Sequence, residues 1–194
     1  MNVHGLDSIL KPKRIAIAGV TINPNSVGGR VLRNLVGGSF RGAVYPVNPG
    51  SEAVLGVPCY PSIASLPRVP DLVAVCSPAE EVEGILRECA ETGVGGVIIM
   101  SAGFGESGPE GAAMQRNLKA IIKEHPEMRV LGPNCLGVTV PSAGLNASFA
   151  PVMPDKGSVA FISQSGALCT SLMDWARREK IGFSAFISVG NAMD

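Results

Sequence analysis

The 194-residue sequence has few charged residues, few aromatic side chains and no long apolar run. Charged residues make up 16% of the chain and aromatic residues 5%, and 16 basic side chains balance 16 acidic ones. This zero net charge gives no support to a nucleic acid or an anionic membrane surface as a partner. The run at residues 97–100 is far below the roughly 20 apolar residues that a membrane-spanning helix needs.

Cysteine pairs and secretory features are missing as well. The five cysteines are far apart and include no CxxC pair, so neither a zinc site nor a thiol-redox motif is indicated and we expect no metal. Residues 1–10 have no basic n-region and no long apolar h-region, so no secretory signal is predicted. The simplest expectation is a cytoplasmic protein with reduced thiols.

Short β-branched runs alternate with helical stretches along most of the chain. Strands are predicted at residues 14–19, 43–47, 72–76, 97–100 and 129–131, with a short last strand at 138–140. Helices are predicted at residues 28–36, 78–93 and 110–123. Strands that are apolar on consecutive residues have both faces covered, and helices between them indicate a doubly wound parallel sheet of the Rossmann-like α/β class.

A second unit is predicted after this sheet. Residues 1–140 form the first domain, and residues 141–156, with three prolines, are interpreted as a linker. A strand at 158–162, a helix at 167–179 with Met173 and Trp175 facing the core, and a strand at 183–188 then begin a domain over residues 157–194. Two strands and one helix would leave an apolar face in water, so this domain is interpreted as truncated, and self-association is an open expectation.

Ligands of an open parallel sheet bind at the carboxyl ends of its strands. Small Gly- or Pro-containing loops follow the predicted strands at residues 19–28, 48–50, 77–79, 101–105 and 132–137. Such loops let backbone N–H groups approach an anionic ligand, although ordinary turns without a ligand look similar. NAD is disfavoured because the first loop lacks GxGxxG and Asn48 replaces the acidic residue that would bind the ribose. The longer first loop suits the 3′-phosphorylated ADP of coenzyme A.

The turn Ser163-Gln164-Ser165-Gly166 lies between a strand and a helix of the second unit. The N–H groups and dipole of that helix favour a phosphate, but a plain N-cap explains the same residues. A hydrolase nucleophile elbow would need glycine at position 163 and a later histidine, and no histidine follows Ser165. Cys135, in the last loop of the first domain, is interpreted as a small buried hydrophobe because no nearby base or cation marks it as reactive.

Together, several strings resemble those of ADP-forming acyl-CoA synthetases, a family related to the α-subunit of succinyl-CoA synthetase. The strings are Val44-Tyr45-Pro46-Val47-Asn48-Pro49, Ser101-Ala102-Gly103-Phe104, Leu131-Gly132-Pro133-Asn134-Cys135-Leu136-Gly137 and Phe161-Ile162-Ser163-Gln164-Ser165-Gly166-Ala167-Leu168. The resemblance covers the chain from about Leu6 to its last residue. It implies a CoA-binding Rossmann-like domain followed by the start of a flavodoxin-like domain. In that family, acyl-CoA and phosphate give an acyl phosphate and CoA, and the phosphoryl group moves to a histidine and then to ADP.

The resemblance also implies which residues bind CoA and phosphate. The loop for the CoA phosphates would contain Gly19, Thr21, Ser26, Val27 and Gly28, with Asn48 and Pro49 beside the nucleotide. The pantetheine arm would be flanked by Ser77, Pro78, Ser101, Ala102, Gly103 and Phe104, and the thiol by Asn134 and Cys135. The phosphate would lie at Ser163, Gln164, Ser165 and Gly166.

The chain departs from that family in its cations and its histidines. Many members have a basic residue where this chain has Ser26 and Gly50, so Arg30 or Arg41 would have to compensate. Neither of the histidines, His4 and His125, occupies the position of the phosphorylated one, so no catalytic residue is assigned.

A nucleotide-grasp domain or subunit, which would bind ADP or ATP and Mg²⁺, is therefore implied as a partner outside this chain. By this interpretation the chain binds CoA or acyl-CoA and does not turn over alone. Alternative hypotheses are a CoA-binding regulatory module of a protein lysine acetyltransferase and a stand-alone CoA-binding protein. An NAD-dependent dehydrogenase is the least favoured.

Overall fold

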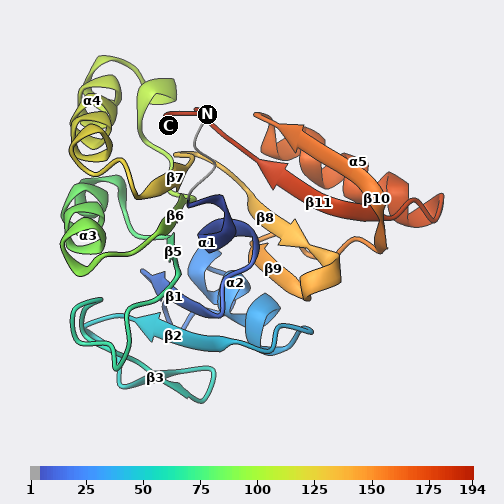
Figure 1. The fold of residues 1–194 in the computed structure, drawn as a ribbon, viewed down its shortest axis with the longest axis horizontal. Coiled ribbons are helices and arrows are strands. Elements are labelled where there is room, and N and C mark those ends of the chain that lie inside the picture. The colour runs from blue at the N-terminus through green and yellow to red at the C-terminus, as the bar shows by residue number, and fades with distance from the viewer. Residues whose placement is uncertain (1–4) are drawn as a thin grey trace.

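The structure is a computed structural model that describes residues 5–194, and its first unit is built on a five-stranded parallel sheet (Figure 1). The strands are β1 (Arg14–Ala18), β2 (Ala43–Val47), β5 (Leu72–Val75), β6 (Gly96–Ile99) and β7 (Arg129–Leu131). Their order is β2-β1-β5-β6-β7, and every pairing is parallel. From β1 the chain first adds β2 on one side and then β5, β6 and β7 on the other side. This change of direction makes the carboxyl end of β1 the topological switch point.

Helices cover both faces of this sheet, so the predicted doubly wound architecture is confirmed (Figure 1). On one face Leu86 and Ile121 pack with Val73, and on the other Leu32 packs with Ile17. Because alternate strand residues face opposite sides, strands covered on both faces are apolar throughout, as the sequence indicated. The helices are α1 (Leu6–Leu10), α2 (Val27–Val36), α3 (Ala79–Thr92) and α4 (Pro109–Glu124), with a 3₁₀ turn, η1, at Gly105–Ser107.

A second sheet, of order β10-β11-β8-β9, includes strands from the end of the first unit. Its members are β8 (Gly137–Val140), β9 (Leu145–Ser148), β10 (Lys156–Ser163) and β11 (Phe183–Ser188). Strand β8 is antiparallel to both β9 and β11, whereas β10 and β11 are parallel. The strand predicted at residues 138–140 is therefore confirmed, but it belongs to this second sheet and not to the first.

The stretch at residues 141–156, predicted as a linker, contains ordered structure. A 3₁₀ turn, η2 (Pro141–Ala143), and Gly144 with φ of +65° lead into β9, all four residues of which are buried. Leu145 and Ala147 pack in the same apolar cluster as Leu32 of α2. The expectation of a stretch without strands is wrong here because packing onto α2 stabilises a strand too short to show a clear period. The division into domains at residues 140 and 157 stays a prediction.

Helix α5 (Gly166–Arg178) covers one face of the second sheet, where Cys169 and Met173 pack with Phe186. Met173 is buried as predicted, but Trp175 is 51% exposed, so its placement in the core is wrong. Strand β10 lies at the edge of the sheet, and Ile162 on it is 63% exposed. The second unit thus keeps exposed apolar surface on β10 and α5.

A small hairpin after β2 was not predicted, and it shapes the switch-point end of the sheet. It joins β3 (Ala53–Val54) to β4 (Val57–Pro58) through Leu55 and Gly56, both with positive φ. Positive φ at both central residues is typical of a type I′ hairpin turn. The chain then returns to β2, where the Tyr60 N–H donates to Pro46 O at 2.9 Å and the Asn48 N–H donates to Tyr60 O at 2.9 Å.

The opposite end of the first sheet is held by Asp71. Its carboxylate accepts the backbone N–H groups of Lys13 and Arg14, each at 2.9 Å, and the guanidinium of Arg14 at 2.6 Å. Partial burial opposes ionisation, but these hydrogen bonds outweigh it and lower the pKa of Asp71. Across residues 5–194 we find no helix with the length and apolar character needed to cross a membrane.

Candidate functional site

A cavity of about 390 Å³ lies at the carboxyl ends of β1, β2 and β5, and we call it the switch-point cavity. Three of the predicted loops meet there. Among the residues that line it are the predicted Gly19, Thr21, Asn48, Pro49, Ser77 and Pro78. The sequence-based expectation of a ligand site at the switch point therefore coincides with a real hollow in the structure.

The first loop is held by side-chain hydrogen bonds at the start of α2. Ser26 Oγ caps the helix by accepting the Gly29 N–H at 3.0 Å, and it also donates to Asn23 O at 2.7 Å. The hydroxyl of Thr21 lies 3.0 Å from Ser26 Oγ. Gly28 lets the helix approach β1, because a Cβ there would lie 2.9 Å from Gly19 O. Ser26, Gly28 and the partly exposed Val27 thus form the helix start beside Thr21 rather than the cavity wall.

The second loop is fixed by Asn48. Its Nδ2 donates to Val20 O at 2.6 Å, while its Oδ1 accepts the Gly50 N–H at 2.8 Å. Its side-chain amide therefore connects the first two loops and leaves little freedom for either. This amide occupies the place where an acidic residue would be expected in an NAD site.

Part of the switch-point cavity was not anticipated from the sequence. The lining residues that were not anticipated come from the segment after β4 and from α3. The two are joined by a hydrogen bond in which Glu88 Oε1 accepts the Ala64 N–H at 2.9 Å. A usable signal existed in α3, since residues 81, 85 and 88 share one helix face. The additional lining residues are Pro61, Ser62, Ile63, Glu81, Ile85 and Glu88.

A second cavity, of about 470 Å³, lies between the two sheets, and we call it the inter-sheet cavity. It brings Asn134 and Cys135, expected near the thiol, together with Gln164, Ser165 and Gly166, expected at the phosphate. Further lining residues are Met100, Leu136, Phe149, Ala167 and Thr170.

The turn at the start of α5 forms one wall of the inter-sheet cavity. Ser165 is the N-cap of this helix and accepts the Leu168 N–H at 3.2 Å, while Ser163 Oγ accepts the Ser165 N–H at 3.1 Å. Ser163 therefore supports the turn and is not among the lining residues. Free N–H groups and the positive end of the helix dipole make such a helix start suitable for an anion.

Cys135 is a structural residue in this wall. It is 3% exposed, and its thiol donates to Ile99 O at 3.2 Å. Burial raises the pKa of the Cys135 thiol to about 12, so it stays protonated and is a poor nucleophile at neutral pH. The interpretation as a small buried hydrophobe agrees with this geometry.

The loop at residues 101–105 lies between the two cavities. The Ser101 hydroxyl donates to Ser77 O at 2.5 Å, and Ser101 O accepts the Asn134 N–H at 2.9 Å. Ser101 thus contacts one lining residue of each cavity. Ala102 and Gly103 are partly or fully exposed, whereas Phe104 is 0% exposed and packs in the core. The prediction that the Phe104 side chain flanks the ligand is therefore wrong, because this side chain is buried in the core.

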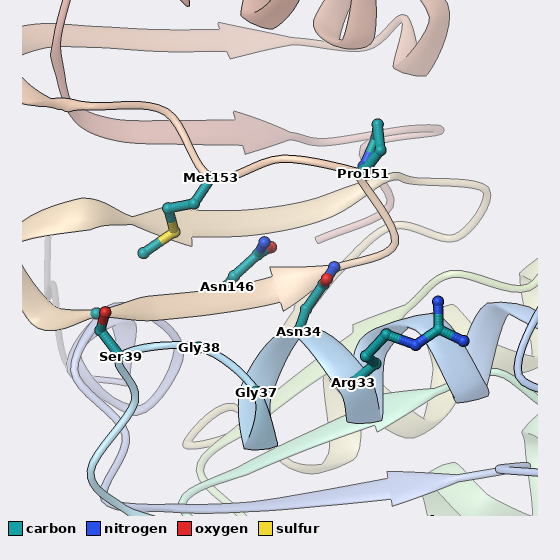
Figure 2. Close-up of a pocket in the computed structure, with 9 residues that line it drawn as sticks. Arg33, Asn34, Gly37, Gly38, Ser39, Asn146, Pro151 and Met153 are labelled. Carbon is teal, nitrogen blue, oxygen red and sulfur yellow. The ribbon is translucent and has the colours of Figure 1, made fainter.

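Another cavity, of about 300 Å³, lies at the far end of α2 and contains none of the predicted site residues (Figure 2). Asn34 beside it donates to Ser148 O at 2.8 Å and to Ala150 O at 2.9 Å, which joins α2 to β9 and the following segment. Because it opens near the carboxyl end of the helix, it is separate from the loops described above. Its labelled residues are Arg33, Asn34, Gly37, Gly38, Ser39, Asn146, Pro151 and Met153.

A doubly wound sheet, a tight glycine turn after the first strand and a cavity at the switch point define the class of nucleotide-binding α/β domains. Within that class, the chain belongs to the CoA binding domain family, whose model matches residues 13–141. A second family, the succinyl-CoA ligase like flavodoxin domain, matches residues 156–194.

Relatives of the chain include ADP-forming CoA ligases. The α-subunit of acetate–CoA ligase [ADP-forming] II from Pyrococcus furiosus is 44% identical over 190 residues, which cover 97% of this chain and 41% of that subunit. Acetate–CoA ligase [ADP-forming] I from Archaeoglobus fulgidus is 38% identical over 186 residues, or 96% of this chain and 27% of that protein.

A solved structure of dinucleotide-forming acetyl-coenzyme A synthetase 1 from Ca. Korarchaeum cryptofilum, in complex with phosphate and ADP, matches with a TM-score of 0.92. It is 38% identical, and the match covers 97% of this chain and 40% of that one. The predicted resemblance to ADP-forming acyl-CoA synthetases is confirmed. The chain spans between 27% and 41% of the length of these relatives.

Proposed function

We propose that this chain is the CoA-binding part of an ADP-forming acyl-CoA ligase, an acid–thiol ligase. The observation that carries the proposal is the pair of cavities joined through Ser101 in a member of the CoA binding domain family. A CoA molecule has a nucleotide end and a thiol end separated by a long arm. Two hollows with a small-residue loop between them suit such a ligand.

In this proposal the nucleotide of CoA occupies the switch-point cavity, and its phosphates face the first loop at Thr21 and the start of α2. The pantetheine arm passes along Ser101, Ala102 and Gly103, and the thioester enters the inter-sheet cavity near Asn134. A phosphate binds at the start of α5.

The helix start at Gln164, Ser165 and Gly166 would assist the reaction electrostatically. When a phosphate oxygen attacks the thioester carbon, the C–S bond breaks, an acyl phosphate forms and CoA leaves as a thiolate that takes up a proton. Backbone N–H groups and the dipole of α5 stabilise the anionic phosphate before and during the attack. This contribution requires no titrating side chain from this chain.

The later phosphoryl transfer would depend on parts outside the described residues. His125 caps α4, and its Nδ1 lies 3.4 Å from Glu127 Oε1, near the amino end of β7. His125 is therefore at the amino ends of the strands, whereas the cavities are at their carboxyl ends. The other histidine, His4, lies outside the described residues. The proposal therefore assigns the histidine to a further part of the second domain, outside this chain, and ADP and Mg²⁺ to a nucleotide-grasp domain or subunit. The chain alone would not turn over.

Of the two arginines expected to compensate for missing cations, only Arg30 lies at the same end of the sheet as the switch-point cavity, and it lines a neighbouring hollow with Asn25 and Phe149. It lies in the first turn of α2, one turn beyond Ser26. Arg41 precedes β2 and Asn48 follows it, and the five-residue strand between them is about 16 Å long. We infer that Arg30, not Arg41, contributes positive charge near the CoA phosphates.

The relatives described above give no support to a regulatory module of a protein lysine acetyltransferase or to a stand-alone CoA-binding protein. The proposal places the ligase in the cytoplasm, which agrees with the free state of all five cysteines.

Isothermal titration with CoA, 3′-dephospho-CoA and NAD at matched ionic strength tests the proposal. We expect saturable binding of CoA, weaker binding of dephospho-CoA because one phosphate contact is lost, and no binding of NAD. Folding is checked by circular dichroism in the same buffer. A folded protein that binds NAD, or that gives no CoA signal at several temperatures, would refute the proposal.

A further inference from the structure

The segment after β11, residues 189–193, joins the second sheet to the loops of the first unit. The Val189 N–H donates to Ser163 O at 2.8 Å, so the segment contacts the turn before α5. Further on, the Asn191 N–H donates to Pro133 O at 2.9 Å and the Met193 N–H to Gly132 O at 3.1 Å. This segment therefore hydrogen-bonds to the residues that immediately precede each wall of the inter-sheet cavity.

The side chain of Asn191 extends the same connection to the loop between the cavities. Its Nδ2 donates to Glu106 Oε2 at 2.6 Å and to Gln115 Oε1 at 2.9 Å. Glu106 Oε1 accepts the N–H groups of Gly103 and Phe104 at 2.7 and 3.1 Å, and Gln115 Oε1 accepts the Gly105 N–H at 3.0 Å. Three consecutive backbone N–H groups are thus bound by two side chains that Asn191 connects.

This network fixes the backbone on both sides of Phe104, whose side chain is anchored in the core. Gly103 has φ of +107°, and residues 103 and 105 both lack a Cβ, so these two positions gain conformational freedom when their acceptors are lost. Partial burial opposes ionisation of Glu106, but the hydrogen bonds from Asn191 and the loop outweigh it and lower the pKa of Glu106. The carboxylate is therefore charged at neutral pH and forms charge-assisted hydrogen bonds, which are the stronger kind.

We propose that Asn191 and Glu106 are positioning residues for CoA, which hold the loop at residues 101–105 in the shape that receives the pantetheine arm. This inference rests on the proposed function and adds a route by which the second unit controls CoA binding in the first. Neither side chain needs to touch the ligand. When the loop is already ordered in the free protein, CoA binding does not have to order it. The loss of conformational entropy on binding is then smaller, and the affinity is higher.

The inference predicts an effect that depends on the length of the ligand. CoA spans both cavities, whereas adenosine 3′,5′-bisphosphate lacks the pantetheine arm and occupies only the switch-point cavity. Removing the Asn191 side chain should therefore weaken CoA binding and leave the bisphosphate unaffected. A merely structural role for Asn191 would weaken both ligands alike.

The experiment compares Asn191→Ala with a matched control in the full 194-residue chain. The control is Asn117→Ala, which also removes a hydrogen bond from an asparagine side chain to a glutamate. Asn117 Nδ2 donates to Glu83 Oε2 at 3.1 Å on the exposed surface between α4 and α3. Isothermal titration measures the dissociation constants of both ligands for each variant. We expect Asn191→Ala to bind CoA about tenfold more weakly, the amount that loss of one hydrogen bond to a charged group gives. Bisphosphate binding and both constants of Asn117→Ala should stay within about twofold, the error of such comparisons.

A second variant keeps the test valid if Asn191→Ala does not fold. Glu106→Gln preserves the size of the side chain but loses the charge, and we expect the same CoA-selective loss. An equal loss for both ligands, or no loss for CoA, overturns the inference while the wild-type binding of CoA still supports the proposed function. Failure of the wild-type chain to bind CoA instead refutes the proposed function itself.

Discussion

Replacing Gly19 by alanine should damage both the stability of the protein and its ligand site. Gly19 has φ of +81°, which costs an alanine about 1–2 kcal/mol. A Cβ would also lie 2.5 Å from the Ser77 nitrogen and 2.8 Å from the Cys76 carbonyl carbon, and backbone atoms cannot rotate away. Overpacking of this kind costs about 1–3 kcal/mol. We expect the free energy of unfolding to fall by about 3 kcal/mol, and the melting temperature by about 6–12 °C.

Gly56→Ala is the matched control for this experiment. Gly56 also has a positive φ, +76°, but nothing lies within 4 Å of its would-be Cβ, so only the conformational cost of about 1–2 kcal/mol should appear. Because Ser77 lines the switch-point cavity, Gly19→Ala should also weaken CoA binding at least about tenfold, the effect of a misplaced contact worth 1.4 kcal/mol, while Gly56→Ala should not. Urea unfolding and isothermal titration measure both effects. Equal destabilisation by the two variants, or unchanged CoA binding by Gly19→Ala, would show that the close approach has been misjudged.

Three further predictions concern stability and association. Asp71→Asn should lower the free energy of unfolding at pH 7 by about 2–3 kcal/mol without changing CoA affinity. Because the pKa of Asp71 is lower in the folded than in the unfolded protein, its carboxylate stabilises the fold at pH values above the unfolded-state pKa. This stabilisation is lost as the pH falls through the folded-state pKa. The free energy of unfolding, measured with urea from pH 7 to 3, should therefore change less with pH in the variant than in wild type. Within residues 5–194, Thr139 Oγ1 is buried with no hydrogen-bond partner, so Thr139→Val should raise the free energy of unfolding by about 1 kcal/mol, and a lower melting temperature in calorimetry would contradict this. Strand β10 is an exposed edge, so we expect concentration-dependent association in sedimentation that Ile162→Lys reduces; identical behaviour of both proteins would exclude this edge.

Long elements of this fold could be predicted from the sequence because their apolar pattern is set by burial on both faces. The helix at residues 110–123 and the strand at 183–188 match α4 and β11 within one residue at each end. Strand β9 could not be found in this way, because its four residues carry no readable period and depend on packing against α2. Trp175 shows that the apolar pattern can also mislead. Its spacing on the helix predicts burial, but its side chain is 51% exposed because no other element within residues 5–194 packs over that part of α5.

Loops of the candidate site were predictable to the extent that they follow strands. Gly19, Asn48 and Ser77 lie together because the carboxyl ends of parallel strands meet at one edge of a sheet. Glu81 and the segment after β4 reach the same cavity from a helix face and a hairpin, and only the tertiary arrangement brings them there. The Asn191 side chain likewise contacts residues 85 and 76 positions away, which no local pattern reveals.

The hairpin of β8 and β9 has a consequence for the proposed binding of CoA across both cavities. It hydrogen-bonds with β11 in the second sheet, yet Val138 and Leu145 are 0% exposed within the apolar cluster of the first unit. Exposing both side chains to swing the second sheet away would cost about 3–6 kcal/mol, so an opened form would be populated below about 1%. The separation between the two cavities is therefore nearly constant. If CoA binds across both cavities as proposed, hinge motion would not accommodate an analogue whose arm is shortened or lengthened by a few bonds, and such an analogue would lose its contacts in one of the two cavities.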